Sequence, residues 1–220
     1  MANTTTRDIY RTLADLKEDL EEGTDFRILR KDRRSNVFIV APHGGYIEPG
    51  TSHLAKAIAG NTFNLFDFQG LRIQEPWRLH VTSTRFRDDR LTVSLMSSLT
   101  AVSIHGMGKT DNWRIWTGGL NKELKFLVEA CLIEAGFWIE STPPKYKGKS
   151  PRNFINLAEK YGVQLELPED LVKVMFRNGI EFTGPKQGNE PALNDLGEHF
   201  VQAVRRALFL YLPGRLLPRP

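Results

Sequence analysis

His43 and Glu48 lie in a turn that follows a run of β-branched and aromatic residues. Glycines at positions 44, 45 and 50 let the backbone fold back, so the imidazole and the carboxylate can converge. Both groups are ordinary zinc ligands. The spacing therefore indicates part of a metal site. The alternative is a turn in which both side chains only hydrogen-bond to neighbouring backbone groups.

A second apolar run, residues 99–104, is followed by His105 and a glycine. Ligands of open α/β sheets bind outside the carboxyl ends of the strands, so the two histidines are expected at one edge of the sheet. His43, Glu48 and His105 would supply three protein ligands and leave one position for water, as in a catalytic zinc site. The pattern therefore predicts Zn2+ as the cofactor.

Glu166 lies in the alternating stretch 162–168 and shares one strand face with Gln164. In a sheet that is covered on both sides, a carboxylate near the end of a strand is costly to bury unless it has a structural or chemical role. Two interpretations stay open from the pattern alone. Glu166 is either a hydrogen-bonded structural residue or the general base beside a zinc-bound water.

Basic residues follow two of the expected elements. Arg85 lies just beyond an expected strand, and Arg152 precedes Asn153. A guanidinium at such a place could bind a substrate carboxylate bidentately, or it could form a surface ion pair. His80, on the expected strand, is more typical of a core or supporting imidazole than of a metal ligand.

Strands that alternate with helices predict an α/β fold, an open mixed sheet flanked by helices on both faces. The expected strands are 26–29, 37–41, 63–68, 77–82, 101–104, 113–116, 137–139 and 162–167. The expected helices are 9–20, 52–59, 91–99, 121–135 and 196–212.

The length of 220 residues suits a single domain over 1–220, with loose ends at 1–6 and 213–220 and its weakest joint at 184–188. The net charge of +4 favours anionic partners, although solubility alone would also explain it. The start of the chain lacks the pattern of a signal peptide, and no apolar run is long enough for a bilayer. We therefore expect cytoplasmic synthesis and no membrane partner.

Four segments together resemble the poly-γ-glutamate hydrolase family, whose phage-encoded and bacterial members include some labelled "phage-related replication protein". The distinctive one is Ala-Pro-His-Gly-Gly-Tyr-Ile-Glu-Pro-Gly-Thr-Ser at 41–52. The others are Leu-His-Val-Thr-Ser-Thr-Arg-Phe at 79–86, Val-Ser-Ile-His-Gly at 102–106, and Asn-Phe-Ile-Asn with Gly-Val-Gln-Leu-Glu-Leu within 153–167. The resemblance extends over about residues 25–210.

The resemblance implies a single zinc-hydrolase-like domain with the fold of zinc carboxypeptidases. It implies His43, Glu48 and His105 as zinc ligands and Glu166 as the general base. The implied reaction is hydrolysis of γ-glutamyl amide bonds by a zinc-activated water. Arg85, Arg152 and Asn153 are expected to contact the substrate, an anionic glutamyl polymer. A phage-encoded member would reach external polymer by cell lysis.

Three alternatives remain at this point. The first is a zinc hydrolase of a small γ-glutamyl or N-acyl amino acid. The second is a replication-associated protein that binds nucleic acid without catalysis. We disfavour it because the chain shows no recognised nucleic-acid-binding motif and its basic residues are scattered over loops. The third is a structural relative without a metal.

Overall fold

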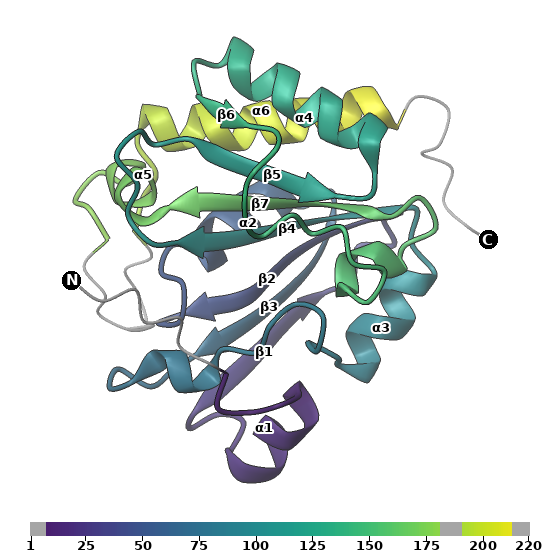
Figure 1. The fold of residues 1–220 in the computed structure, drawn as a ribbon, viewed down its shortest axis with the longest axis vertical. Coiled ribbons are helices and arrows are strands. Elements are labelled where there is room, and N and C mark those ends of the chain that lie inside the picture. Colours follow the sequence, from purple (N-terminus) through teal and green to yellow (C-terminus); the bar gives the residue numbers. More distant parts are fainter. Residues whose placement is uncertain (1–7, 181–190, 213–220) are drawn as a thin grey trace.

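The computed structural model describes residues 8–180 and 191–212, and in them it places one seven-stranded sheet with helices on both faces (Figure 1). The expectations for 1–6, 184–188 and 213–220 lie outside the described residues. In sheet order the strands are β1 (Phe26–Lys31), β3 (Asn64–Gly70), β2 (Val37–Gly45), β4 (Thr100–Met107), β7 (Gly162–Pro168), β5 (Ile115–Gly119) and β6 (Ile139–Glu140). The helices are α1 (Leu13–Asp19), α2 (Thr51–Ala59), α3 (Asp89–Met96), α4 (Lys122–Glu134), α5 (Glu169–Val174) and α6 (Asp195–Tyr211), with 3-10 turns η1 (Pro76–Leu79) and η2 (Phe154–Leu157).

The sheet is mixed, as the sequence predicts. Strands β3, β2, β4 and β7 run parallel to one another, whereas β1 and β5 pair antiparallel with β3 and β7. Because β2, β4 and β7 are parallel neighbours, their carboxyl ends meet at one edge of the sheet. His43, His105 and Glu166 lie near the carboxyl ends of β2, β4 and β7, and therefore near that edge.

Two apolar layers sandwich the sheet, and alternate residues of β2 enter opposite layers. Val37 and Ile39 pack with α2, α4 and α6, whereas Phe38 and Val40 pack with α1, α3 and η2. Figure 1 shows α4 and α6 running side by side along the sheet, in agreement with their extensive contact. Both faces of the central strands are covered, so most of their side chains are apolar, and the candidate ligands His43 and His105 lie near the strand ends.

None of the helices in the described part of the chain has the length and apolar character needed to cross a bilayer.

The expected strand at 77–82 is wrong. The segment forms η1, in which Pro76 occupies the first turn and the His80 N–H donates to the carbonyl of Trp77. Proline fixes φ near the helical value and so favours this turn. The alternation of apolar residues arises because Leu79, at the end of η1, and Val81, in the loop that follows, are both buried. His80 therefore belongs to an irregular segment.

The predicted helix at 9–20 is shorter, because Thr12 and Asp15 form a capping box that starts α1 at Leu13. The short helix α5 was not predicted. Strands β2 and β4 run further than expected, to Gly45 and Met107. The two predicted ligand histidines thus lie inside the strand ends rather than beyond them.

Pro42 marks an irregularity that turns the end of β2. The register of β2 against β3 shifts between Ala41 and Gly44. Proline has no N–H for the ladder and occurs in strands mainly at edges or bulges. The shift re-aims the strand at His43, immediately before the turn that carries Glu48.

The turn after His43 packs tightly on β3. Gly45 has φ of 65°, and a Cβ on Gly44 would lie 2.1 Å from the Ser52 hydroxyl and 2.3 Å from Asp67. The Gly45 N–H donates to Ser52 Oγ (2.9 Å), and Ser52 donates to Asp67 Oδ1 (2.8 Å). Only glycine fits at position 44, because any Cβ there would clash. The fully buried carboxyl group of Asp67 supports the turn through Ser52.

Burial raises the pKa of Asp67 to about 6, despite hydrogen bonds from Gln69 and Ser52. The native state then binds more protons than the unfolded chain between about pH 4 and pH 6, so this group makes the free energy of unfolding fall as the pH rises through 6. We expect a loss of about 1 kcal/mol between pH 5 and pH 7 that Asp67→Asn abolishes. Urea denaturation at both pH values measures it. Identical pH dependence in wild type and variant would contradict this assignment, and exposed Asp32→Asn is the control.

Candidate metal centre

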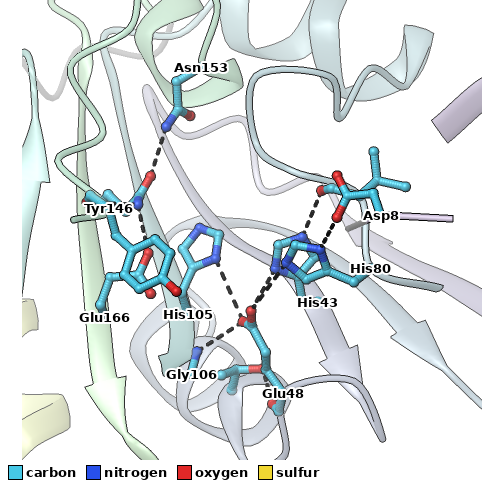
Figure 2. Close-up of polar contacts among 12 residues, drawn as sticks. Asp8, His43, Glu48, His80, His105, Gly106, Tyr146, Asn153 and Glu166 are labelled. Atoms are coloured by element: carbon cyan, nitrogen blue, oxygen red, sulfur yellow. Dashed lines mark hydrogen bonds and ion pairs between the residues drawn. The ribbon is translucent and has the colours of Figure 1, made fainter. Parts of the chain in front are cut away.

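Three donor groups converge where β2 and β4 end. Glu48 Oε1 lies 2.8 Å from His43 Nδ1, and Glu48 Oε2 lies 3.6 Å from His105 Nδ1. One ligand atom from each of the three residues falls within 4.8 Å of the others. Figure 2 shows both imidazoles directed at the Glu48 carboxylate. The structure therefore brings together the three residues that the sequence singles out as ligands.

The donor set fits a divalent cation. In a tetrahedral zinc site the ligand atoms are about 3.3 Å apart, and the two separations in this site, 2.8 and 3.6 Å, lie on either side of that value. His43 Nε2 lies 2.9 Å from the Val81 carbonyl, which can only accept, so Nε2 donates and Nδ1 faces Glu48. A nitrogen lone pair 2.8 Å from a carboxylate oxygen requires a proton or a cation between them.

Glu48 stays ionised, as a metal ligand must. Burial acts to raise its pKa, but the charge on His43 and hydrogen bonds from both histidines outweigh that and hold the pKa well below its usual range. The backbone N–H of Gly106 also donates to Glu48 Oε2, at 2.9 Å. His105 has its other nitrogen, Nε2, buried without a hydrogen-bond partner among the described residues.

His80 and Asp8 form a second layer beside His43. The His80 ring lies 4.1 Å from the His43 ring, and its Nδ1 is 2.7 Å from Asp8 Oδ1. Asp8 also accepts from the backbone N–H of Thr82. His80 thus occupies the supporting place that its sequence context favours. Asp8 was missed, because an acidic residue in a polar lead gives no sign of contacting a site more than seventy residues away.

Glu166 lies beside the three-residue cluster because it is the register partner of His105 in the β4–β7 ladder. Both side chains therefore project from the same face of the sheet. Burial, and next the charge of Glu48, raise the pKa of Glu166 well above its usual range, against a hydrogen bond from Gln164. A raised pKa makes the carboxylate a stronger proton acceptor, as a general base requires.

Tyr146 is a further neighbour that sequence reasoning missed. Figure 2 shows its ring beside Glu166. Burial, and then the charges of Glu166 and Glu48, raise the pKa of its hydroxyl. Tyr146 has φ of 52°, in the left-handed region that bulky residues rarely adopt. Its place in a loop rich in proline and lysine gave no sign that the ring lies beside Glu166.

A cleft of about 1490 Å³ contains the three-donor cluster and Glu166. Arg85 and Asn153 line it, but Arg152 does not. The Arg152 side chain is exposed, and its carbonyl accepts a hydrogen bond from Arg87. Asn153 is buried and directs its amide at Gln164. Of the three residues predicted to contact substrate, the structure thus brings two to the cleft. The other cationic lining residues are Arg11 and Lys145, and the cleft is also lined by Tyr46, Trp77 and Tyr146.

Known proteins resemble this chain over most of its length. The SPbeta prophage-derived UPF0714 protein YoqZ of Bacillus subtilis (strain 168) is 33% identical over 184 residues, which cover 79% of this chain and 66% of YoqZ. A solved bacteriophage poly-γ-glutamate hydrolase superposes with a TM-score of 0.87 at 29% identity, over 94% of this chain and 99% of that one. A zinc-free structure of YndL gives 0.81 at 25% identity, over 92% and 98%.

The match therefore spans about two thirds of YoqZ and nearly the whole of the two solved chains. The family model described as poly-gamma-glutamate hydrolase matches residues 10–203. That range contains every residue of the three-donor cluster, the neighbouring Glu166 and most of the cleft lining. The chain belongs to the poly-γ-glutamate hydrolase family.

Proposed function

We propose that this protein is a zinc-dependent hydrolase that cleaves γ-glutamyl amide bonds of poly-γ-glutamate. The observation that carries the proposal is the convergence of His43, Glu48 and His105 beside Glu166 in one cleft. Two imidazoles and one carboxylate form a donor set typical of catalytic zinc, with a coordination position left for water. The family of the chain supplies the class of bond.

The residues around the cluster divide the reaction between them. Zinc held by His43, Glu48 and His105 would supply a Lewis acid and a bound water of lowered pKa. Glu166 accepts a proton from the attacking water and delivers it to the nitrogen of the leaving amine. The raised pKa of Glu166 suits both steps, because the carboxyl group must hold the proton between them. Glu48, with its lowered pKa, stays ionised throughout.

The cleft suits an anionic polymer. A γ-linked glutamate chain carries a free α-carboxylate on every residue. The exposed cations Arg11, Arg85 and Lys145 line the cleft, and none of them has a side-chain partner among the described residues. Arg85 can bind a carboxylate bidentately. The volume of about 1490 Å³ exceeds the roughly 300–1000 Å³ of small-molecule sites, which favours a polymer over a small γ-glutamyl or N-acyl amino acid.

Removal of either imidazole should abolish zinc binding. We expect His43→Ala and His105→Ala to lose stoichiometric zinc, since each leaves two protein ligands for the ion. Elemental analysis of the purified protein measures the content, and circular dichroism checks the fold. His199→Ala, an exposed position on α6, should keep its zinc. Full zinc occupancy in both cluster variants would rule out this ligand set.

Loss of the base should separate catalysis from metal binding. In Glu166→Gln we expect kcat to fall about 100-fold or more, the range for loss of a general base, with zinc retained. The measurement is the rate at which the polymer shortens, followed by size-exclusion chromatography. Exposed Glu123→Gln on α4 is the matched control. An unchanged kcat would remove Glu166 from this role.

Neutralising the cleft cations should weaken polymer binding. For Arg85→Ala and Lys145→Ala we expect KM for poly-γ-glutamate to rise about fivefold each, equivalent to roughly 1 kcal/mol for an exposed charge contact. Added salt should reduce the difference from wild type. Lys122→Ala, exposed at the start of α4, controls for net charge. Wild-type protein that cleaves a γ-glutamyl dipeptide but leaves the polymer intact would favour the small-substrate alternative.

A further inference from the structure

A line of buried amides runs to the carboxyl group of Glu166. Asn153 Nδ2 donates to Gln164 Oε1 at 2.7 Å, and Gln164 Nε2 donates to Glu166 Oε1 at 2.7 Å. The three residues are only 3%, 4% and 5% exposed. Figure 2 shows these contacts leading from Asn153 to Glu166. Neither amide titrates, so the two amides keep their donor groups at any pH that the folded protein tolerates.

The backbone fixes the direction of every donor in this line. Asn153 caps η2, where its Oδ1 accepts from the Ile155 N–H at 3.3 Å. Its Nδ2 must therefore face Gln164, whose carbonyl oxygen accepts. The NH2 group of Gln164 is then left facing Glu166, and it also donates to the carbonyl of Tyr146 at 3.2 Å. If the Gln164 amide were flipped, its NH2 group would face the NH2 group of Asn153, and its oxygen would face the acceptor oxygens of Glu166 and Tyr146.

This arrangement leaves one oxygen of Glu166 for chemistry. Oε1 is held by Gln164, whereas no described residue donates a hydrogen bond to Oε2. Glu166 lines the cleft that contains the three-donor cluster. Since the terminal torsion of a glutamate is broad and roughly two-fold, a carboxyl group without such a contact would rotate freely.

We propose that Gln164 and Asn153 are positioning residues that hold the Glu166 carboxyl group with one oxygen directed at the attacking water. The proposal rests on the proposed role of Glu166. It gives Asn153 a task other than the substrate contact expected from the sequence: Asn153 acts on kcat through Gln164, and KM is left nearly unchanged.

Two variants remove the donors and keep the shape. Gln164→Met preserves the length of the side chain without its NH2 group. Asn153→Asp keeps the oxygen that caps η2 but cannot donate to Gln164. We expect kcat on poly-γ-glutamate to fall about tenfold or more in each, the scale seen when groups that orient active-site residues are lost. KM should change less than about twofold, and zinc content should stay stoichiometric.

Asn121→Asp is a matched control. Asn121 is also a buried helix cap, with Oδ1 accepting from Leu124 and Nδ2 donating to Thr100 and Tyr211. Thr100 lies five residues before His105 on β4, about 17 Å away along a strand. The control therefore loses buried amide bonds of the same kind far from the cleft, and its melting temperature should fall while kcat per folded molecule stays constant.

A double-variant cycle identifies the route of the effect. If Gln164 acts through Glu166, adding Gln164→Met to Glu166→Gln should lower kcat by less than about twofold. If Gln164→Met does not fold, Asn153→Asp takes its place in the cycle. Normal kcat in the single variants beside an impaired Glu166→Gln would overturn this inference alone. So would a raised KM with normal kcat in Asn153→Asp. Full activity of Glu166→Gln would overturn the proposed function and the inference with it.

Discussion

The carboxylate of Glu48 ties two buried histidines from different strands into one group, and the surrounding fold is organised to permit this. A charge in a largely apolar sheet is costly unless it is paired and hydrogen-bonded. Glu48 meets both conditions through His43, His105 and the N–H of Gly106. The shift at Pro42, the close approach of Gly44 to β3 and the parallel pairing of β2 with β4 each contribute to placing these partners.

Two carboxyl groups at the same sheet edge have opposite properties, and the neighbours of each explain why. Glu48 faces two imidazoles, which favour its charged form. Glu166 is buried with a neutral amide and lies within the field of Glu48, so its charged form is disfavoured. A pair of titratable groups whose environments separate their pKa values is the usual basis for assigning different chemical roles. Here it distinguishes the proposed ligand, Glu48, from the proposed base, Glu166, although both are glutamates.

Much of this could be predicted from the sequence. Buried parallel strands produce continuous apolar runs, and these located β2 and β4 together with the histidines near their ends, whereas β7 was predicted from its alternation. Local sequence patterns gave the wrong structure, or no prediction, where contacts between distant parts of the chain determine the position of a residue. Leu79 and Val81 alternate like strand residues, yet Pro76 commits the segment to a 3-10 turn. Asp8 and Tyr146 reach the site through tertiary contacts, and a single sequence contains no periodicity or spacing that reveals such contacts. Strand period placed Glu166 opposite the apolar face of its strand, but it left the role of the side chain open, and only the family resemblance implied a general base.

The contact of Asp8 with both His80 and Thr82 extends the site to the first described residue of the chain. The segment before α1 thus contacts the 80–86 loop, and through Asp8 it holds His80 and Thr82, which line the cleft. A recombinant form trimmed past position 8 would keep the whole sheet and every proposed ligand, yet the imidazole beside His43 would lose its anchor. Shortening the amino terminus past Asp8 would therefore remove a support of the proposed centre while leaving its three donor residues in place.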